Sequence, residues 1–454
     1  MASRVYSTSA IDPSKYKILR VLPQEGTSLT FTAAGGNTAT FSLPINEVFN
    51  FSKSWLQYTR TIPGSAGATH YTYTHKLGWT DIDRITLRPA SGVPLIDLQY
   101  VNNYTNCVFP HYVSVQTLSE QPKGGNGVEL CTGLRENNAL VDGVTNVDYA
   151  KKLVSGVAGG TPAVENAFIN YGDIQTLEVA GDQVAVVQRI NYPLGLLFHS
   201  LFNQNIDMPS CDQLYLTIVF ASIPKIGYDA TSITDGVTGG GTQAIAPTGA
   251  SLELDLCIIK DQSQKSAIFQ KFKSGIEIPC DFVSSGLINH SASTIHSLQI
   301  RPSIIHGSRL KRIIYAPFNT TQTNTMAYEH SNRADRFSEL QTATMDADQL
   351  YHKVLDMSAG DGYLMKREAL KGSAIQSLNQ WLYHFMWVES WDDESVKLDQ
   401  SIVQGLPLAV GQREYQVQWT ANGTGATNWY YWIVGQKILK LKWSEMGAGE
   451  ALLI

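Results

Sequence analysis

The residues that could do chemistry in this chain are few and scattered, beginning with its histidines. His70 lies near His75, and His290 lies near His296, so either pair could ligate a metal ion together with a distant carboxylate. The acidic segment Trp391-Asp-Asp-Glu394 could hold a cation such as Ca²⁺. Structural histidines with satisfied hydrogen bonds and a solvated acidic turn are the simpler interpretations, and we favour them.

Glycine clusters and catalytic motifs give no stronger signal. The clusters at Gly124-Gly125, Gly159-Gly160 and Gly239–Gly241 do not open the helix of a βαβ unit, so they are interpreted as loop residues and not as a phosphate cradle. The chain has no G-x-x-x-x-G-K-[ST], H-E-x-x-H, G-x-S-x-G or EF-hand pattern. The sequence therefore predicts no catalytic residue, no cofactor site and no metal site.

Tryptophans and glycosylation sequons could point to carbohydrate. A sugar platform needs exposed aromatic rings, whereas the alternating pattern places Trp419 and Trp443 in a core, so packing is favoured. The crowded tryptophans of the last quarter are Trp381, Trp387, Trp391, Trp419, Trp429, Trp432 and Trp443. N-x-[ST] sequons occur at Asn50, Asn103, Asn289, Asn319 and Asn422. Without a signal peptide these sequons are interpreted as chance matches.

The elements that must position these residues follow one pattern twice. A run at 192–198 is followed by a strand at 214–220 and, after a Gly/Thr-rich loop, by a strand at 252–258. A run at 382–388 is likewise followed by strands at 415–419 and 438–443. Strict period-two alternation indicates half-buried antiparallel strands. The repeated order predicts one all-β sandwich built twice, which favours a structural building block over an enzyme.

Further elements complete this organisation. Short strands are predicted at 28–32, 38–43, 54–61, 70–73, 84–87, 277–283, 296–304 and 310–315. Lys260–Lys273 is the best helix, with Asp261 as its N-cap and Ala267, Ile268, Phe269 and Phe272 at helical spacing. We place the domain boundary at this helix. The predicted parts are an N-terminal arm at 1–20, a first unit at 21–262 with long loops at 119–182 and 224–250, a connecting helix at 263–275, and a second unit at 276–454 with a long loop at 319–371.

Composition limits the classes of function. The chain has 454 residues, of which 43% are hydrophobic and only 16% are charged, a low share that suits large buried oligomer interfaces or an ordinary Thr-rich β protein. Its net charge is −6 without a basic run, so direct binding to nucleic acid is not expected. The five cysteines, Cys107, Cys131, Cys211, Cys257 and Cys280, form no C-x-x-C pair and predict a reducing compartment. No signal peptide or membrane span is predicted.

Four passages share a pattern that is specific as an ordered set. They are Ile85–Gly92 leading to Leu95–Asp97, Tyr192–Phe198 with Met208–Phe220, Leu254–Phe272, and Tyr430–Ile454 with Met446–Gly449. In this order they resemble the major capsid proteins of the double jelly-roll viruses. That lineage spans membrane-containing bacteriophages, adenovirus-like viruses, virophages and large DNA viruses. This chain has Ala90-Ser-Gly92 where the family usually has Gly-Gly.

The resemblance implies both fold and function. It implies two consecutive eight-stranded antiparallel jelly rolls, standing roughly perpendicular to a capsid surface, and no enzymatic activity. It implies a homotrimer with a pseudo-hexameric outline that tiles an icosahedral DNA virus shell. The expected partners are neighbouring capsomers, minor capsid and penton proteins, and an internal membrane on the inner face. The protein would reside in the virion capsid after folding in the host cytoplasm or nucleus, without secretion.

Three alternatives make different demands on the sequence. A jelly-roll glycan-binding or spike protein should show a secretory signal, disulfides or a carboxylate pair framed by exposed aromatics. A penton or minor capsid protein needs a single jelly roll. An enzyme on a double-barrel cupin scaffold should carry a His-x-His…Glu…His cluster on its strands, and no such cluster is visible.

Overall fold

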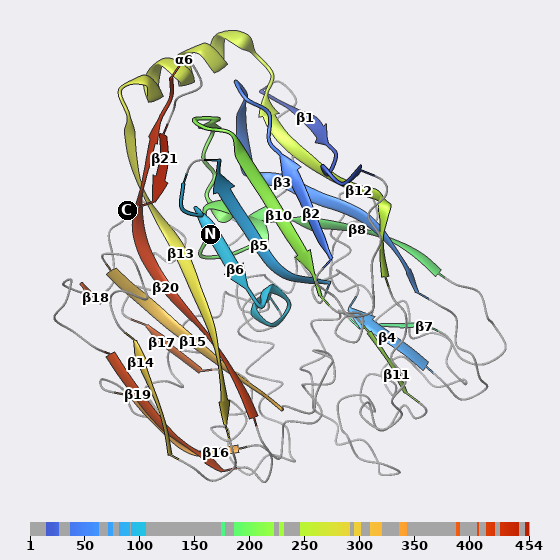
Figure 1. Cartoon of the computed structure of the whole chain (residues 1–454), viewed down its shortest axis with the longest axis vertical. Coiled ribbons are helices and arrows are strands. Elements are labelled where there is room, and N and C mark those ends of the chain that lie inside the picture. Colours follow the sequence, from blue (N-terminus) through green and yellow to red (C-terminus); the bar gives the residue numbers. More distant parts are fainter. Residues whose placement is uncertain are drawn as a thin grey trace.

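The computed structural model describes a set of segments built almost entirely from antiparallel strands (Figure 1). These segments are residues 15–26, 37–62, 71–75, 81–90, 92–105, 174–177, 186–221, 227–230, 246–290, 295–300, 309–319, 336–342, 387–390, 406–407, 415–422, 427–444 and 450–453. No helix within them is long and apolar enough to cross a membrane.

The first unit consists of two sheets. One has the order β1 (Tyr16–Val21), β12 (Ala246–Ile259), β3 (Val48–Ile62) and β8 (Val186–Pro193), with the short β9 (Met208–Pro209) beside β3. The other has the order β2 (Thr38–Ser42), β10 (Leu214–Phe220), β5 (Ile82–Pro89) and β6 (Ile96–Gln99). Apart from the consecutive strands β5 and β6, neighbouring strands in these sheets are distant in sequence, as Greek-key connections of a jelly roll require.

The second unit repeats this topology. One sheet has the order β13 (Ile276–His290), β20 (Thr427–Lys442), β15 (Arg309–Asn319) and β17 (Trp387–Ser390), with β18 (Leu406–Pro407) on β15 and β21 (Glu450–Leu453) on β20. The other has the order β14 (Ile295–Ile300), β19 (Tyr415–Asn422) and β16 (Arg336–Thr342).

Each strand in these two sheets of the second unit has a counterpart at the same place in the sheets of the first unit. β13, β20, β15 and β17 stand where β1, β12, β3 and β8 stand, and β14, β19 and β16 stand where β2, β10 and β5 stand. The described residues hold no counterpart of β6 in the second unit, so its count of eight strands stays a prediction. The predicted fold class, two successive jelly rolls in an all-β chain, is confirmed.

The core forms where alternation predicted it. In β10 every second residue is buried, and Leu214, Leu216, Ile218 and Phe220 are all at most 1% exposed. In β12, Cys257 and Ile259 are buried on the opposite parity as well. They pack with Tyr16 and with Phe269 of the connecting helix, so this end of the sheet is covered on both faces.

The connecting helix α6 (Gln262–Lys273) joins β12 to β13. Asp261 caps it as predicted, because its carboxylate accepts from the backbone N–H of Ser263 at 3.3 Å and of Gln264 at 3.2 Å. Phe269 and Phe272 are buried, whereas Ala267 is exposed and Lys265 is buried instead. The apolar face of the helix is therefore narrower than the spacing predicted.

Strand register gives the first unit two distinct ends. Tyr16 at the start of β1 pairs with Ile259 at the end of β12, so the N-terminal segment enters beside α6. At the other end, the end of β3 pairs with the beginnings of β8 and β12, as in the pair Ile62 with Val186. The ends of β6 and β10 pair there with the beginning of β5, as in the pair Phe220 with Ile82. The chain segments that follow β3, β6 and β10 all leave from this second end, opposite α6 (Figure 1).

Parts of the predicted loops and of the predicted arm are strands. β7 (Ile174–Leu177) lies in the loop at 119–182 and β11 (Gly227–Ala230) in the loop at 224–250, and both pair with β4 (Tyr71–His75) in a third sheet. β12 also begins within 224–250, and β16 lies within 319–371. β1 begins at Tyr16, inside the predicted arm at 1–20. These strands are short or pair with distant segments, so local alternation does not reveal them. The predicted strand at 28–32 lies outside the described residues.

Candidate functional site

The side chains of the four histidines singled out in the sequence lie outside the described set, so the structure does not test the two proposed histidine pairs. His75 lies in β4, His290 in β13 and His296 in β14. In the part of the chain that the structure describes, no group of three or more His, Cys, Asp and Glu could hold a metal ion. His70, the acidic segment Trp391–Glu394 and the three glycine clusters lie outside the described residues.

Two of the sequon asparagines are structural. Asn50 is 1% exposed, and its side-chain amide donates to Asn205 Oδ1 at 2.9 Å and to Asp207 Oδ1 at 3.1 Å. Asn103 is 2% exposed. Neither side chain is accessible for a glycan in the folded chain. Asn289, Asn319 and Asn422 lie in β13, β15 and β19, and their side chains are outside the described set.

The tryptophans that the structure describes pack inside the protein. Trp432 is fully buried in β20, and its ring lies 5.5 Å from that of Tyr104. Trp443 is half-buried just after β20, where its ring lies 4.6 Å from that of Phe269 in α6. Both positions serve packing and not an exposed sugar platform. The side chain of Trp419 lies outside the described set.

The buried cysteines are poor nucleophiles. Cys211, Cys257 and Cys280 are free thiols, and each is at most 3% exposed. Burial raises the pKa of each thiol to about 12, which keeps it protonated and unreactive near neutral pH. Covalent catalysis by these three residues is therefore disfavoured.

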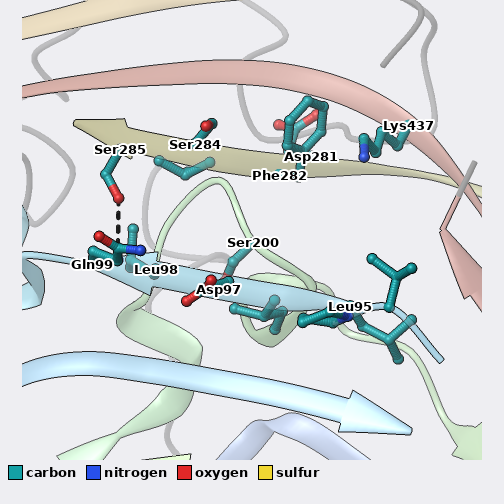
Figure 2. A pocket seen from close by; sticks show the side chains of 14 residues that line it. Leu95, Asp97, Leu98, Gln99, Ser200, Asp281, Phe282, Ser284, Ser285 and Lys437 are labelled. Carbon is teal, nitrogen blue, oxygen red and sulfur yellow. Dashed lines mark hydrogen bonds between the residues drawn. The ribbon is translucent and has the colours of Figure 1, made fainter. Parts of the chain in front are cut away.

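What the structure does bring together is a seam between the two jelly rolls. The edge strand β6 lies against the edge strand β13, and the backbone N–H of Gln99 donates to Ser285 Oγ at 3.2 Å (Figure 2). Farther along, Gln204 Nε2 donates to the Pro279 carbonyl at 3.1 Å. Sequence alternation marks such residues as buried or exposed but does not reveal that they meet across two units.

Aromatic rings continue the seam. Tyr100 of the first unit packs edge-on against Tyr430 of the second, with ring centroids 4.9 Å apart. Tyr104 meets Trp432, and its hydroxyl donates to the Phe198 carbonyl at 3.0 Å and lies 2.7 Å from His199 Nδ1. Burial raises the pKa of Tyr104 well above its usual value, so it stays a neutral phenol. Side chains of both units belong to one continuous apolar cluster.

The second unit also buries a charge pair near the seam. Asp281 of β13 and Lys311 of β15 are each 2% exposed, and Lys311 Nζ lies 3.1 Å and 3.2 Å from the two carboxylate oxygens. Each charge is costly to bury alone, and their mutual pairing offsets that cost. The pair links β13 to β15 across the intervening strand β20.

A pocket of about 250 Å³ lies along the seam. The β6 segment from Val93 to Gln99 lines one wall, and Asp281–Ser285 of β13 line the other, with Ser200 and Lys437 completing the lining. Figure 2 shows Lys437 towards one end and Ser285 towards the other. The walls come from both units, so the pocket exists only when the two jelly rolls are docked.

A second polar cluster fixes the start of β1 at the α6 end. Asp207 accepts from Lys15 Nζ at 2.6 Å and from the Tyr16 hydroxyl at 2.8 Å, in addition to Asn50. Burial favours the protonated acid, but the hydrogen bonds from Lys15, Asn50 and Tyr16 outweigh it and lower the pKa of Asp207. Nearby, buried Lys265 of α6 pairs with Glu47. These contacts hold the start of β1 and the helix α6 against the rest of the first unit.

Comparisons with known proteins fit this architecture. No family model matches the chain, and no curated protein sequence matches it significantly. A chain in the 3.5 Å cryo-EM structure of the Sputnik virophage aligns with a TM-score of 0.52 and 11% identity over 98% of this chain and 89% of that chain. A chain of the PBCV-1 virus capsid gives 0.49 and 12% over 98% of both. The mavirus major capsid protein gives 0.47 and 10% over 98% of this chain and 91% of that chain.

The Sputnik likeness concerns the fold. It extends over nearly the whole of this chain, so both units and the helix between them are included. Together with the repeated strand order, it confirms the double jelly-roll fold that the four sequence passages indicated.

Proposed function

We propose that this double jelly-roll chain is a major capsid protein, a structural building block of an icosahedral DNA virus shell and not an enzyme. The observation that carries the proposal is the repeated strand order of the two units, joined along a buried seam. The fold shared with a chain of the Sputnik virophage particle supports it. So do the three described cysteines, Cys211, Cys257 and Cys280, whose thiols are buried and protonated.

The doubled unit has a geometric use in such a shell. Three copies of a chain with two similar domains present six similar units around one axis, and closed threefold symmetry fixes how they meet. We infer a homotrimeric, pseudo-hexameric capsomer that contacts neighbouring capsomers and minor capsid and penton proteins. The buried seam supports this role, because a capsomer must hold its two domains in one orientation.

The two ends of the molecule suggest its orientation. The N-terminal segment and α6 lie at one end, and the segments following β3, β6 and β10 leave at the other. We propose that the α6 end faces inward, towards minor proteins or an internal membrane, and that the opposite end forms the outer surface. The net charge of −6 supports a shell that does not bind the genome directly.

The division of the chain follows from the same proposal. We propose an arm at 1–20 whose last residues join β1, a first jelly roll at 21–262, a connecting helix at 263–275 and a second jelly roll at 276–454. In this scheme the chain acts within the virion after folding inside the host cell.

The mass of the purified protein in solution tests the proposal. Light scattering after size-exclusion chromatography near neutral pH should give about three times the chain mass of 50.0 kDa, stable to dilution. Negative-stain images should then show a pseudo-hexagonal outline. A protein that stays monomeric at high concentration would contradict the trimer and direct attention to glycan binding.

A further inference from the structure

Lys437 is a buried lysine that has no counter-ion among the described residues. It lies in β20, lines the seam pocket, and is 8% exposed. Its Nζ lies 4.6 Å from the ring centroid of Phe282, a cation–π contact. In the described segments, no carboxylate pairs with it and its ammonium donates no hydrogen bond. Most of the side chain is withdrawn from water at the wall of the pocket, so an anion bound in the pocket would be stabilised by the ammonium.

The other charges of the pocket are already neutralised. Asp97 accepts two hydrogen bonds from the guanidinium of Arg84, at 2.6 Å and 2.7 Å. Asp281 is paired with Lys311. Of the charged side chains that line the pocket, Lys437 is therefore the one without a partner of opposite charge among the described residues.

The neighbouring thiol does not supply the missing charge. Burial raises the pKa of Cys280 to about 12, so the group stays neutral near pH 7. Burial also lowers the pKa of Lys437, which shows that the site as it stands disfavours the charged form. An anion bound beside Nζ would reverse that effect.

The shape and lining of the pocket select the kind of anion. Its volume of about 250 Å³ admits several waters or one small organic acid. Val93 is 67% exposed, so the pocket reaches the surface there. The side chains of Leu95 and Phe282 form an apolar part of the pocket wall. Ser285 Oγ accepts from Gln99 and still has its own hydrogen to donate.

We propose that the seam pocket binds a carboxylate that carries a short apolar chain, with the carboxylate oxygens paired to Lys437. The carboxylate can come from a free small acid or from an acidic side chain of another protein copy. This inference does not depend on the proposed oligomeric state, because both walls belong to one chain.

Butyrate is a suitable probe, with uncharged butyramide as its matched control. At constant ionic strength near pH 7, butyrate should raise the thermal unfolding midpoint saturably, and butyramide should not. Lys437→Met keeps the length of the side chain and removes the charge. This variant should fold as judged by circular dichroism, and its apparent affinity for butyrate should fall about tenfold or more. Exposed Lys442→Met, on the same strand, should respond as the wild type does.

Light scattering in the same titration separates the two sources. If a free acid fills the pocket, the mass stays constant while the midpoint rises. If another copy supplies the carboxylate, butyrate competes with it and lowers the mass, and Lys437→Met lowers the mass without ligand. An equal midpoint rise with butyramide, an unaltered response in Lys437→Met, or no response in either measurement would overturn the proposal.

Discussion

Replacing Trp432 measures how strongly the two jelly rolls depend on their seam. The side chain is 0% exposed in β20, and its ring meets that of Tyr104 from the first unit at 5.5 Å. Trp432→Ala removes the apolar contacts and leaves a cavity that the surrounding strands cannot fill. We expect a loss of about 3–5 kcal/mol in the free energy of unfolding. The two units should also unfold less cooperatively, since Tyr104 loses its partner.

Trp432→Phe should behave differently because of a polar atom. The indole Nε1 of Trp432 is buried and has no hydrogen-bond acceptor in the described part of the chain. An unsatisfied buried donor costs about 1–3 kcal/mol, and phenylalanine removes it. The smaller ring also leaves a small void, which acts in the opposite direction. We therefore expect Trp432→Phe to change stability by no more than about 1 kcal/mol.

Denaturant unfolding followed by circular dichroism and by fluorescence measures both changes. In Trp432→Ala the midpoint should fall, and the two signals should no longer coincide. Trp55→Ala is the matched control, because that half-buried indole donates to Asp255 within the first unit and not across the seam. It should lower stability without separating the two transitions. If Trp432→Phe lowers stability as much as Trp432→Ala does, the reasoning about Nε1 is refuted. If the Trp432→Ala transitions coincide at the wild-type midpoint, the two units do not depend on the seam for stability.

Three further predictions concern other parts of the fold. The pKa of Asp207 is lower in the native state than in the unfolded state, so its ionised form stabilises the fold. This stabilisation is complete above the pKa of the unfolded state, about 4, and is lost as the pH falls through the pKa of the native state. Asp207→Asn should lower the thermal midpoint at pH 7 and flatten its decline in acid. Lys311→Met should cost about 3–5 kcal/mol in denaturant unfolding, because it leaves Asp281 buried without this partner, and adding Asp281→Asn should restore part of the loss. Gly195→Ala should sharply reduce the yield of folded protein, since a Cβ there would lie 2.4 Å from the Ser52 carbonyl oxygen.

Matched controls decide these three predictions. Lys440→Met removes an exposed pair with Glu277 and should cost less than about 1 kcal/mol, so an equal loss would contradict the role of burial. Gly92→Ala brings its Cβ within 2.9 Å of a Pro89 side-chain carbon and not of backbone, so a normal yield is expected. An acid decline that is the same in Asp207→Asn as in the wild type would show that Asp207 does not set it.

Sequence periodicity predicted the core strands because their burial is local. In β10 the apolar residues that alternate in the sequence are the ones that the structure buries, and in β12 they are buried together with Cys257 and Ile259. The N-cap at Asp261 was also predictable, since the cap and the helix it starts are adjacent in the chain. β7, β11 and β16 were not, because each is short and its partner strand lies far away in the sequence.

The seam and its pocket could not be predicted for the same physical reason. Alternation in β20 marks Trp432 as buried, but it does not reveal that Tyr104 is its partner. Lys437 looks like one more charge in a basic strand, and nothing nearby in the sequence shows that its side chain lines a pocket between two units. The repeated order of strands did give one usable signal. It predicted two similar sandwiches, and a buried contact between them was the remaining unknown.

The seam also gives the duplication a physical purpose within one chain. β6 ends one sheet of the first unit and β13 ends one sheet of the second, and exposed strand edges invite pairing with other chains. Here the two edges face each other, and Ser285 Oγ accepts from the edge N–H of Gln99. A single jelly roll of this kind would leave one such edge open. Joining two units through α6 therefore covers one edge of each within a single chain.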